Sequence, residues 1–383
     1  MAIRDPTAEI AGAGLAGLAV AAALAQRGWR VRVHEKGSAL REIGAGIYLF
    51  QNALDGLREL GVYDWVAASG VRAEQPRLLL DHKHREVNIR RSGDPLPELI
   101  VILRTELHRI LARRALELGV EIATNSRVIG ADPLGRLEFA SGPGDLVDLV
   151  VGADGVFSSV RTSLGLATRL VELHDGCGRH LIPRKATDSV NARRIEMWNG
   201  GRRVGIAPTS PDQHYVFLCC SANDHAGRMQ KPFNLQTWAE SHAAYRDYLE
   251  RLPRDPPEDW RPFFDVTCFS WSKGRACLVG DAAHGMAPNL GQGAGVAIVS
   301  AVVLGRALAY ARDVPEGLRL WEQSERPYVT RTQRVSYLYG VIGTRWPRML
   351  LGLRSQVLPL LSRTDLFQRN LRCAIEHQPT LPQ

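Results

Sequence analysis

The first 35 residues alternate between the two hydrophobic periodicities that distinguish strands from helices. Residues 7–11 predict a short strand, the alanine-rich residues 18–26 predict a helix, and residues 30–35 alternate as a second strand. Arg27 and Gly28 supply the basic last turn and the glycine stop that are typical of a helix end. This pattern therefore predicts a compact βαβ unit.

A second strand-turn-helix pattern lies between residues 276 and 308. The apolar residues 276–279 predict a buried strand and residues 296–308 predict a helix, separated by an acidic turn and a glycine-rich loop. Ligands of open α/β sheets bind at the carboxyl ends of strands, and a helix N-terminus stabilises an anion. The segment is therefore a candidate ligand site, although a glycine-rich turn between a core strand and a core helix has the same pattern.

Between about residues 170 and 270 the helical periodicity fades and short alternating segments replace it. Asn199-Gly200-Gly201 separates two of these segments and predicts a hairpin. We expect a mostly antiparallel sheet inserted between Asp154 and Asp281. Tyr215 and Phe217 share one face of it, which lines a pocket or packs on helices.

A helix is expected to open in the segment Arg104-Thr105-Glu106-Leu107, with Thr105 as the N-cap, and to run through Leu118. Further helices are expected from Arg306 to the end of the chain. Pro347 and Pro359 are expected to break the C-terminal part into pieces. An apolar stripe there favours helices docked on the body of the protein. Binding to a membrane surface or to a partner is the alternative.

Composition narrows the functional class. The 383 residues are 45% hydrophobic and 23% charged, as in ordinary globular proteins, and the net charge of +8 contains no long basic run. Nucleic-acid motifs are absent, and no run of about 18 uncharged apolar residues predicts a membrane span. The six cysteines contain no C-x-x-C pair, so we expect no metal site, and buried free thiols point to a cytoplasmic protein.

Residues 12–17, Gly-Ala-Gly-Leu-Ala-Gly, form a G-x-G-x-x-G motif inside the predicted βαβ unit. Gly12 allows the tight turn, Gly14 lets a pyrophosphate approach the helix, and Gly17 lets the helix pack on the strand. Glu35 ends the second strand, where it can accept hydrogen bonds from an adenosine ribose. The motif predicts binding of an adenine dinucleotide and does not separate NAD from FAD.

Tyr48 carries the only hydroxyl in a glycine-rich apolar stretch at residues 44–49, and it is either a ligand-binding group or a core tyrosine. Arg104, just ahead of a predicted helix, binds a ligand phosphate or a nearby carboxylate. His284 lies in the glycine loop, and we assign it no role as an acid or base.

Three motifs in this order resemble the fingerprints of the single-component FAD-dependent aromatic hydroxylases, the para-hydroxybenzoate hydroxylase-like group. They are residues 12–17 with Glu35, residues 152–161 and residues 279–295. The stretch around Tyr48 is most similar to the hydroxypyridine-carboxylate oxygenases and the salicylate and quinolone hydroxylases. One departure is Ile298-Val299-Ser300, where many members have Glu-Asp-Ala.

The resemblance implies an α/β fold. A discontinuous Rossmann-like FAD-binding domain would comprise residues 1–169 and 271–330, with a mostly antiparallel substrate domain at 170–270 and C-terminal helices at 331–383. Implied cofactor-binding residues are Gly12, Gly14, Leu15, Ala16, Gly17, Glu35, Lys36, Gly46, Arg104, Asp154, Gly280, Asp281, Pro288, Gly291, Gly293, Ala294 and Gly295. Expected substrate-binding residues are Tyr48, Tyr215, Phe217 and Pro288.

The implied activity is a monooxygenase in which NADH or NADPH, as a transient reductant, reduces FAD. Oxygen then adds to give a flavin hydroperoxide that hydroxylates a small electron-rich aromatic or N-heteroaromatic ring. No residue is assigned as catalytic acid or base. The alternatives are a flavin reductase or halogenase on the same fold, or a non-catalytic binding protein. We expect a monomer or a homodimer.

Overall fold

The computed structural model describes residues 5–40, 44–87, 96–188, 193–229, 231–256 and 259–378. Its first sheet has the order β17-β18-β11-β1-β2-β7. The strands are β1 (Thr7–Ala11), β2 (Arg30–His34), β7 (Glu121–Ala123), β11 (Leu149–Gly152), β17 (Ser272–Lys273) and β18 (Ala276–Leu278). All neighbours pair in parallel except β17 and β18, so the carboxyl ends of β1, β2, β11 and β18 share one edge.

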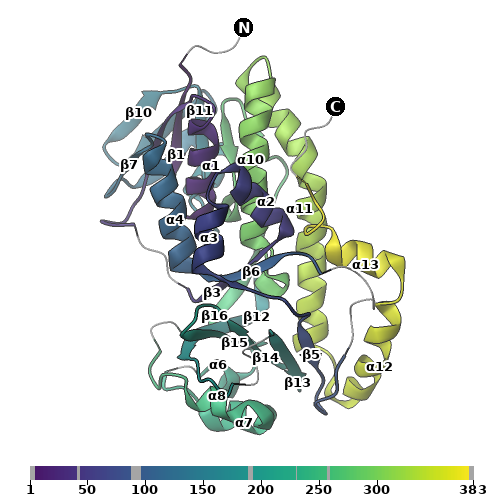
Figure 1. The fold of residues 1–383 in the computed structure, drawn as a ribbon. Coiled ribbons are helices and arrows are strands. Elements are labelled where there is room, and N and C mark those ends of the chain that lie inside the picture. Colours follow the sequence, from purple (N-terminus) through teal and green to yellow (C-terminus); the bar gives the residue numbers. More distant parts are fainter. Residues whose placement is uncertain are drawn as a thin grey trace.

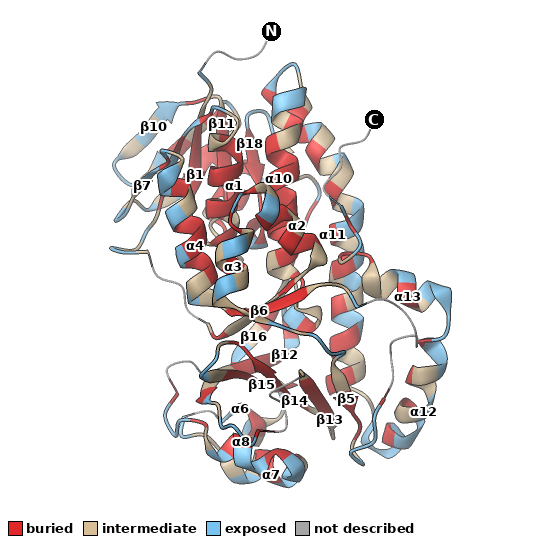
Figure 2. Ribbon diagram, in the orientation of Figure 1, coloured by how far each residue is buried: buried red, intermediate tan, exposed pale blue. Residues whose placement is uncertain are grey.

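Three helices are associated with this sheet. α1 (Leu15–Ala25) contacts β1 and β2, and α4 (Arg104–Glu117) and α10 (Gly293–Tyr310) pack on α1. α1 and α10 contact each other and are buried over most of their length (Figures 1 and 2). Their alanine, glycine and valine side chains leave no polar face, as expected of helices enclosed by protein. α10 is long and apolar enough to cross a membrane, but 67% of it is buried inside the protein, which makes it a core helix.

The second sheet has the order β16-β12-β15-β14-β13-β5 and lies below the first in Figure 1. Its strands are β5 (Leu78–Leu80), β12 (Ala167–Pro183), β13 (Ile195–Asn199), β14 (Arg202–Pro208), β15 (Gln213–Ser221) and β16 (Arg261–Cys268). Pairing is antiparallel except between β13 and β5, and the hairpin predicted at Asn199–Gly201 joins β13 to β14. One face packs on the small helices below it, around Trp238 and Leu249.

The remaining elements complete the body. Two further sheets have three strands each. One contains β3 (Gly46–Phe50), β4 (Val71–Arg72) and β6 (Leu99–Leu103). The other contains β8 (Val128–Asp132), β9 (Arg136–Phe139) and β10 (Gly142–Leu146). The other helices are α2 (Gln51–Glu59), α3 (Tyr63–Ser69), α5 (Ser159–Leu164), α6 (His225–Arg228), α7 (Leu235–Ser241), α8 (Arg246–Glu250), α9 (Asp281–His284), α11 (Val314–Thr344), α12 (Leu351–Leu361) and α13 (Asp365–Arg372), with 3-10 turns η1 (Ala243–Tyr245), η2 (Pro288–Leu290) and η3 (Arg348–Leu350). The expected α/β fold with a mostly antiparallel second sheet is confirmed.

Two local predictions were wrong. Thr105 is not an N-cap, because α4 begins at Arg104 and Leu103 takes the capping position without a side-chain bond. Pro359 does not break the C-terminal helices, because it lies inside α12. α12 docks on the body through Leu358, which packs near Tyr339 of α11, so part of the apolar stripe is core.

Buried histidines make the stability of the fold depend on pH. Burial lowers the pKa of His242 to about 3 and that of His284 to about 4, from an ordinary 6.5. Between pH 6.5 and these values the unfolded chain binds more protons than the folded chain. The free energy of unfolding should therefore fall as the pH is lowered from 6.5 toward 4.

The corresponding prediction concerns the variant His242→Gln, with the free energy of unfolding measured by urea titration between pH 4.5 and 7.5. Removing one titrating group should make the acid-side slope shallower by up to about 1.4 kcal/mol per pH unit. His225→Gln, at an exposed histidine, should keep the parent slope. An unchanged slope in His242→Gln would show that other groups control acid unfolding.

Candidate active site

A cavity of about 820 Å³ lies between the carboxyl edge of the first sheet and one face of the second. Strand ends, the α10 loop and the inner face of the second sheet all contribute to its wall. Residues expected at the cofactor or the substrate that line it are Gly12, Gly14, Leu15, Ala16, Glu35, Lys36, Gly46, Tyr48, Arg104, Asp154, Tyr215, Phe217, Gly280, Asp281, Pro288, Gly291, Gly293 and Ala294. The fold therefore brings together residues that are far apart in the sequence.

The end of the cavity nearest β1 and β2 has the geometry of a dinucleotide-binding turn. Gly12 has a φ of 104°, and a Cβ there would lie 2.5 Å from the carbonyl oxygen of Ala153, so only glycine fits. The Glu35 carboxylate accepts hydrogen bonds from the backbone N–H groups of Ala13, at 3.2 Å, and Gly37, at 2.8 Å. It thus holds the turn and retains acceptor capacity for a ribose hydroxyl.

Gly17 and Gly295 do not line the cavity. A Cβ on Gly17 would lie 2.0 Å from the carbonyl oxygen of Gly12, and one on Gly295 would lie 3.3 Å from Ala53. Both glycines therefore serve close packing of a helix, one against the turn and the other against α2.

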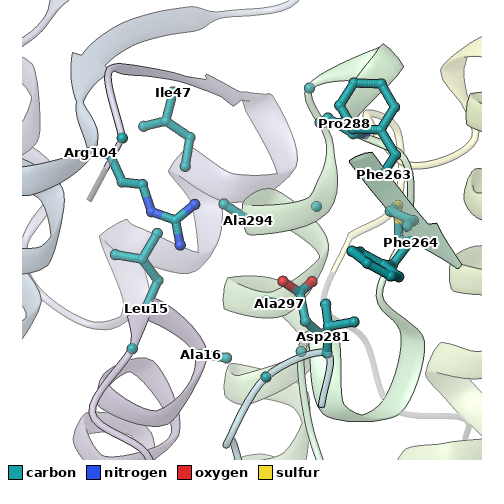
Figure 3. A pocket seen from close by; sticks show the side chains of 18 of the residues that line it. Leu15, Ala16, Ile47, Arg104, Phe263, Phe264, Asp281, Pro288, Ala294 and Ala297 are labelled. Atoms are coloured by element: carbon teal, nitrogen blue, oxygen red, sulfur yellow. The ribbon is translucent and has the colours of Figure 1, made fainter. Parts of the chain in front are cut away.

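The segment after β18 continues the cavity wall from the dinucleotide turn, since a Cβ on Gly280 would lie 2.7 Å from that of Ala16. Asp281 is the first residue of α9, Pro288 opens η2, and Gly291 follows with a φ of 68°. Arg104 and Asp281 approach the same space from opposite sides, with Ala294 of α10 between them (Figure 3). An arginine, a carboxylate and a helix N-terminus around one space fit the phosphate, ribitol and ring portions of FAD.

Asp154 has a structural task besides lining the cavity. Its carboxylate accepts hydrogen bonds from the Ser158 hydroxyl, at 2.5 Å, and from the backbone N–H groups of Ser159, at 2.7 Å, and Val160, at 3.2 Å. It therefore fixes the start of α5 where β11 ends.

An aromatic wall lies where β3 faces the second sheet. The Tyr48 ring is 6.4 Å from Phe50 and 6.3 Å from Tyr215, and Tyr215 is 5.9 Å from Phe217. Tyr48 also packs against the glycine loop, since a Cβ on Gly291 would lie 2.7 Å from its ring. Burial raises the pKa of Tyr48 to about 12, so its hydroxyl stays neutral and can donate a hydrogen bond.

A cluster of charged side chains on the same wall was not anticipated from the sequence. Glu196 accepts hydrogen bonds from Arg203, at 2.9 Å, and from Arg77, at 2.7 Å. Burial alone would raise the pKa of Glu196, but the two guanidinium groups hold it below its ordinary value. Burial lowers the pKa of the neighbouring Arg194 to about 10, so Arg194 remains charged at neutral pH.

The signal for this cluster was present in the sequence. Residues 194–197, Arg-Ile-Glu-Met, alternate polar and apolar, which normally marks a strand with one solvent-facing side. In the structure both faces are covered, because Ile195 and Met197 face the small helices while Glu196 lines the cavity. The charged residues Arg194 and Glu196 on this predicted strand of the inserted domain were the sequence signal for the cluster.

Comparison with known proteins agrees with this geometry. The model of a family described as an FAD binding domain matches residues 5–334. The chain belongs to this family. A probable 2-heptyl-3-hydroxy-4(1H)-quinolone synthase of Rhodococcus erythropolis is 32% identical over 379 residues, 98% of this chain and 97% of the relative. The 6-hydroxynicotinate 3-monooxygenase of Bordetella bronchiseptica is 27% identical, with 87% and 91% covered.

Solved structures give the same assignment. The tetrameric form of 2-methyl-3-hydroxypyridine-5-carboxylic acid oxygenase superposes with a TM-score of 0.85 at 34% identity, covering 98% of both chains. A Klebsiella pneumoniae protein complexed with FAD and uric acid has a TM-score of 0.78 at 22% identity and shares the fold. This FAD-binding-family chain is an FAD-dependent monooxygenase, and NAD(P)H is the reductant typical of the family.

Asp281→Ala should weaken FAD binding more than it perturbs the fold. Each hydrogen bond to a charged group contributes roughly 1.5–3 kcal/mol, so we expect the Kd for FAD to rise about 10- to 100-fold. The measurement is FAD titration of apoprotein whose far-UV dichroism matches the parent. Asp212→Ala, at an exposed aspartate outside the cavity, is the control, and equal affinity in both variants would exclude the contact.

Proposed function

We propose that this monooxygenase hydroxylates a small planar N-heteroaromatic ring that carries an anionic oxygen substituent, a carboxylate or an ionised ring hydroxyl. The charge balance of the aromatic wall carries this proposal. Arg77, Arg194 and Arg203 line the cavity, Arg203 fully buried and the other two half-buried, and the buried Glu196 is the carboxylate beside them. Burying excess positive charge is costly unless an anion compensates it.

Arg194 is the group best placed to bind that anion. Its guanidinium lies 5.5 Å from the centre of the Tyr48 ring and 6.0 Å from that of Phe50. Its Nε has no hydrogen-bond partner among the described residues, although the atom is buried. Arg77 and Arg203, by contrast, are both engaged with Glu196. A substrate anion beside Arg194 would satisfy the orphaned donor.

The names of the relatives support the same class of substrate. The hydroxypyridine-carboxylic acid oxygenase and the 6-hydroxynicotinate monooxygenase are named for N-heteroaromatic rings with a carboxyl group. The Rhodococcus relative is named for a quinolone with a heptyl chain, which offers a ring oxygen but no carboxylate. A neutral alkylquinolone is therefore the second candidate substrate.

When bound, FAD supplies the activation of oxygen by electrons from NAD(P)H. The residues of the chain supply position and environment. Tyr215 and Phe217 form an aromatic wall beside the ring, Arg194 fixes its anionic substituent, and the neutral Tyr48 hydroxyl donates a hydrogen bond to that substituent. The first turn of α10 stabilises negative charge on the bound cofactor by typically about 0.3–1 kcal/mol.

The proposal extends to domain boundaries, location and oligomeric state. We keep the domain boundaries at residues 169, 270 and 330 as a proposal. The first falls inside β12, the last falls inside α11, and β5 joins the second sheet from within the first range. A cytoplasmic location suits the fold, which is that of soluble flavoenzymes. A monomer or homodimer is still our expectation, while one solved relative is tetrameric.

Arg194→Gln tests the substrate class. Loss of a charge-assisted hydrogen bond worth about 1.5–3 kcal/mol should lower kcat/KM for a hydroxypyridine carboxylate about 10- to 100-fold. Turnover of the corresponding methyl ester should change little. The neighbouring Arg193→Gln, at a residue outside the cavity, is the matched control. The anionic class is refuted if the parent enzyme prefers the ester or 2-heptyl-4-quinolone.

Tyr48→Phe tests the orienting hydrogen bond. The substitution keeps the ring against Gly291 and deletes one bond with a net value of roughly 0.5–1.5 kcal/mol. We expect retained FAD and retained NAD(P)H oxidation, with more hydrogen peroxide released per hydroxylated product. The measurement is the ratio of product to NAD(P)H oxidised. A parent-like ratio together with a parent-like KM would make Tyr48 a packing residue.

A further inference from the structure

Two cysteines face each other on the wall of the cavity. Cys177 of β12 and Cys219 of β15 are directly opposite in the antiparallel register, and both line the cavity. Opposed residues of antiparallel strands have Cβ atoms about 4.5–5.5 Å apart, close to the separation of about 3.5–4.5 Å in a disulfide. Both cysteines are free and buried, so reagents reach them through the cavity.

The surroundings make the two thiols unequal. Cys177 and Cys219 share a side-chain hydrogen bond, the Cys177 thiol also donates to the carbonyl oxygen of Gly178 at 3.1 Å, and Arg203 lies opposite Cys219 on β14. Burial alone would raise the pKa of Cys177, but the bond with Cys219 and the nearby Arg179 lower it below its ordinary value. The pKa of Cys219 is raised. Cys177 is therefore the more nucleophilic thiol, with Cys219 as its partner.

The pair lies close to the part of the cavity wall that we assign to the flavin ring. Cys177 and Cys219 belong to one apolar cluster with Phe263 and Ala287. Ala287 directly precedes Pro288, which lines the cavity at the end assigned to the flavin ring. Reduction of oxygen without hydroxylation of a ring releases hydrogen peroxide, and it would do so inside this cavity.

We propose that Cys177 and Cys219 form a peroxide-reactive pair that closes reversibly to a disulfide. The Cys177 thiolate attacks hydrogen peroxide, so an S–O bond forms, the O–O bond breaks, and the released hydroxide takes up a proton as water. The Cys219 sulfur then attacks the sulfenic acid, forming the S–S bond and expelling a second water. The two sulfurs lose two electrons and the peroxide gains them. Only the source of peroxide rests on the proposed function.

The neighbouring Cys220 provides a matched control. It follows Cys219 on β15 but points to the opposite face, into the cluster around Trp238. Burial raises its pKa far above the ordinary value. It should therefore remain reduced under conditions that oxidise the pair.

The test treats the holoenzyme with a few equivalents of hydrogen peroxide and counts thiols in denaturant. The expected count falls from six per chain to four, and dithiothreitol restores it. Non-reducing tryptic digestion of Cys220→Ala should join the peptide of residues 170–179 to that of residues 204–228. Retention of six thiols, or sulfinic acid at Cys177 without the joined peptide, would overturn the proposal.

Single variants separate the roles of the two thiols. Cys219→Ala should stop at a Cys177 sulfenic acid that dimedone labels, whereas Cys177→Ala should leave Cys219 unmodified. Both should retain FAD, which verifies the fold. Labelling of Cys219 in Cys177→Ala at the rate of Cys177 in Cys219→Ala would contradict the assigned order.

A second arm replaces added peroxide by NAD(P)H in air, with and without catalase. Formation of the joined peptide here would support reduction of oxygen by the enzyme as the source. If added peroxide joins the peptides and NAD(P)H does not, the pair stands and this source is overturned. The two arms therefore distinguish a cysteine pair that does not react with peroxide from an enzyme that does not reduce oxygen.

Discussion

The arrangement of the cavity depends on the hydrogen bonds that the buried carboxylate of Glu196 accepts. It accepts hydrogen bonds from Trp198 on its own strand, from Arg203 on β14 and from Tyr339 on α11. Arg203 in turn donates to the side chain of Asn289 in η2, at 2.6 Å. Removing one member of such a buried network typically costs about 3–5 kcal/mol, because an unpaired charge is left behind.

This network explains how two sheets with separate cores form one site. Asn289 donates to the carbonyl oxygen of Ser336 on α11, so the loop beside the flavin end is held by the helix that also contacts Glu196. The substrate wall and the glycine loop therefore keep a fixed separation. Positioning a ring against a cofactor requires this kind of rigidity, since small displacements are costly in rate.

The sequence predicted the first sheet better than the second because glycine and acid positions report local backbone requirements. Gly12, Glu35 and Asp281 lie at strand ends, where spacing along the chain determines their place. Arg77 and Glu196 are 119 residues apart, and their contact depends on the parallel pairing of β5 with β13. Local periodicity carries no information about such a pairing. Pro359 was misjudged for a related reason, because tertiary packing of α12 outweighs the cost of a proline in a helix.

The position of β5 also bears on how the molecule can be divided. The second sheet takes its edge strand from residues 78–80, which lie well before the rest of that sheet in the sequence. A fragment of residues 170–270 would expose the unpaired edge of β13 and leave Glu196 without Arg77, inviting association between copies along that edge. The two sheets are therefore parts of one cooperative unit, and exchange of the inserted sheet between relatives would have to carry this short strand with it.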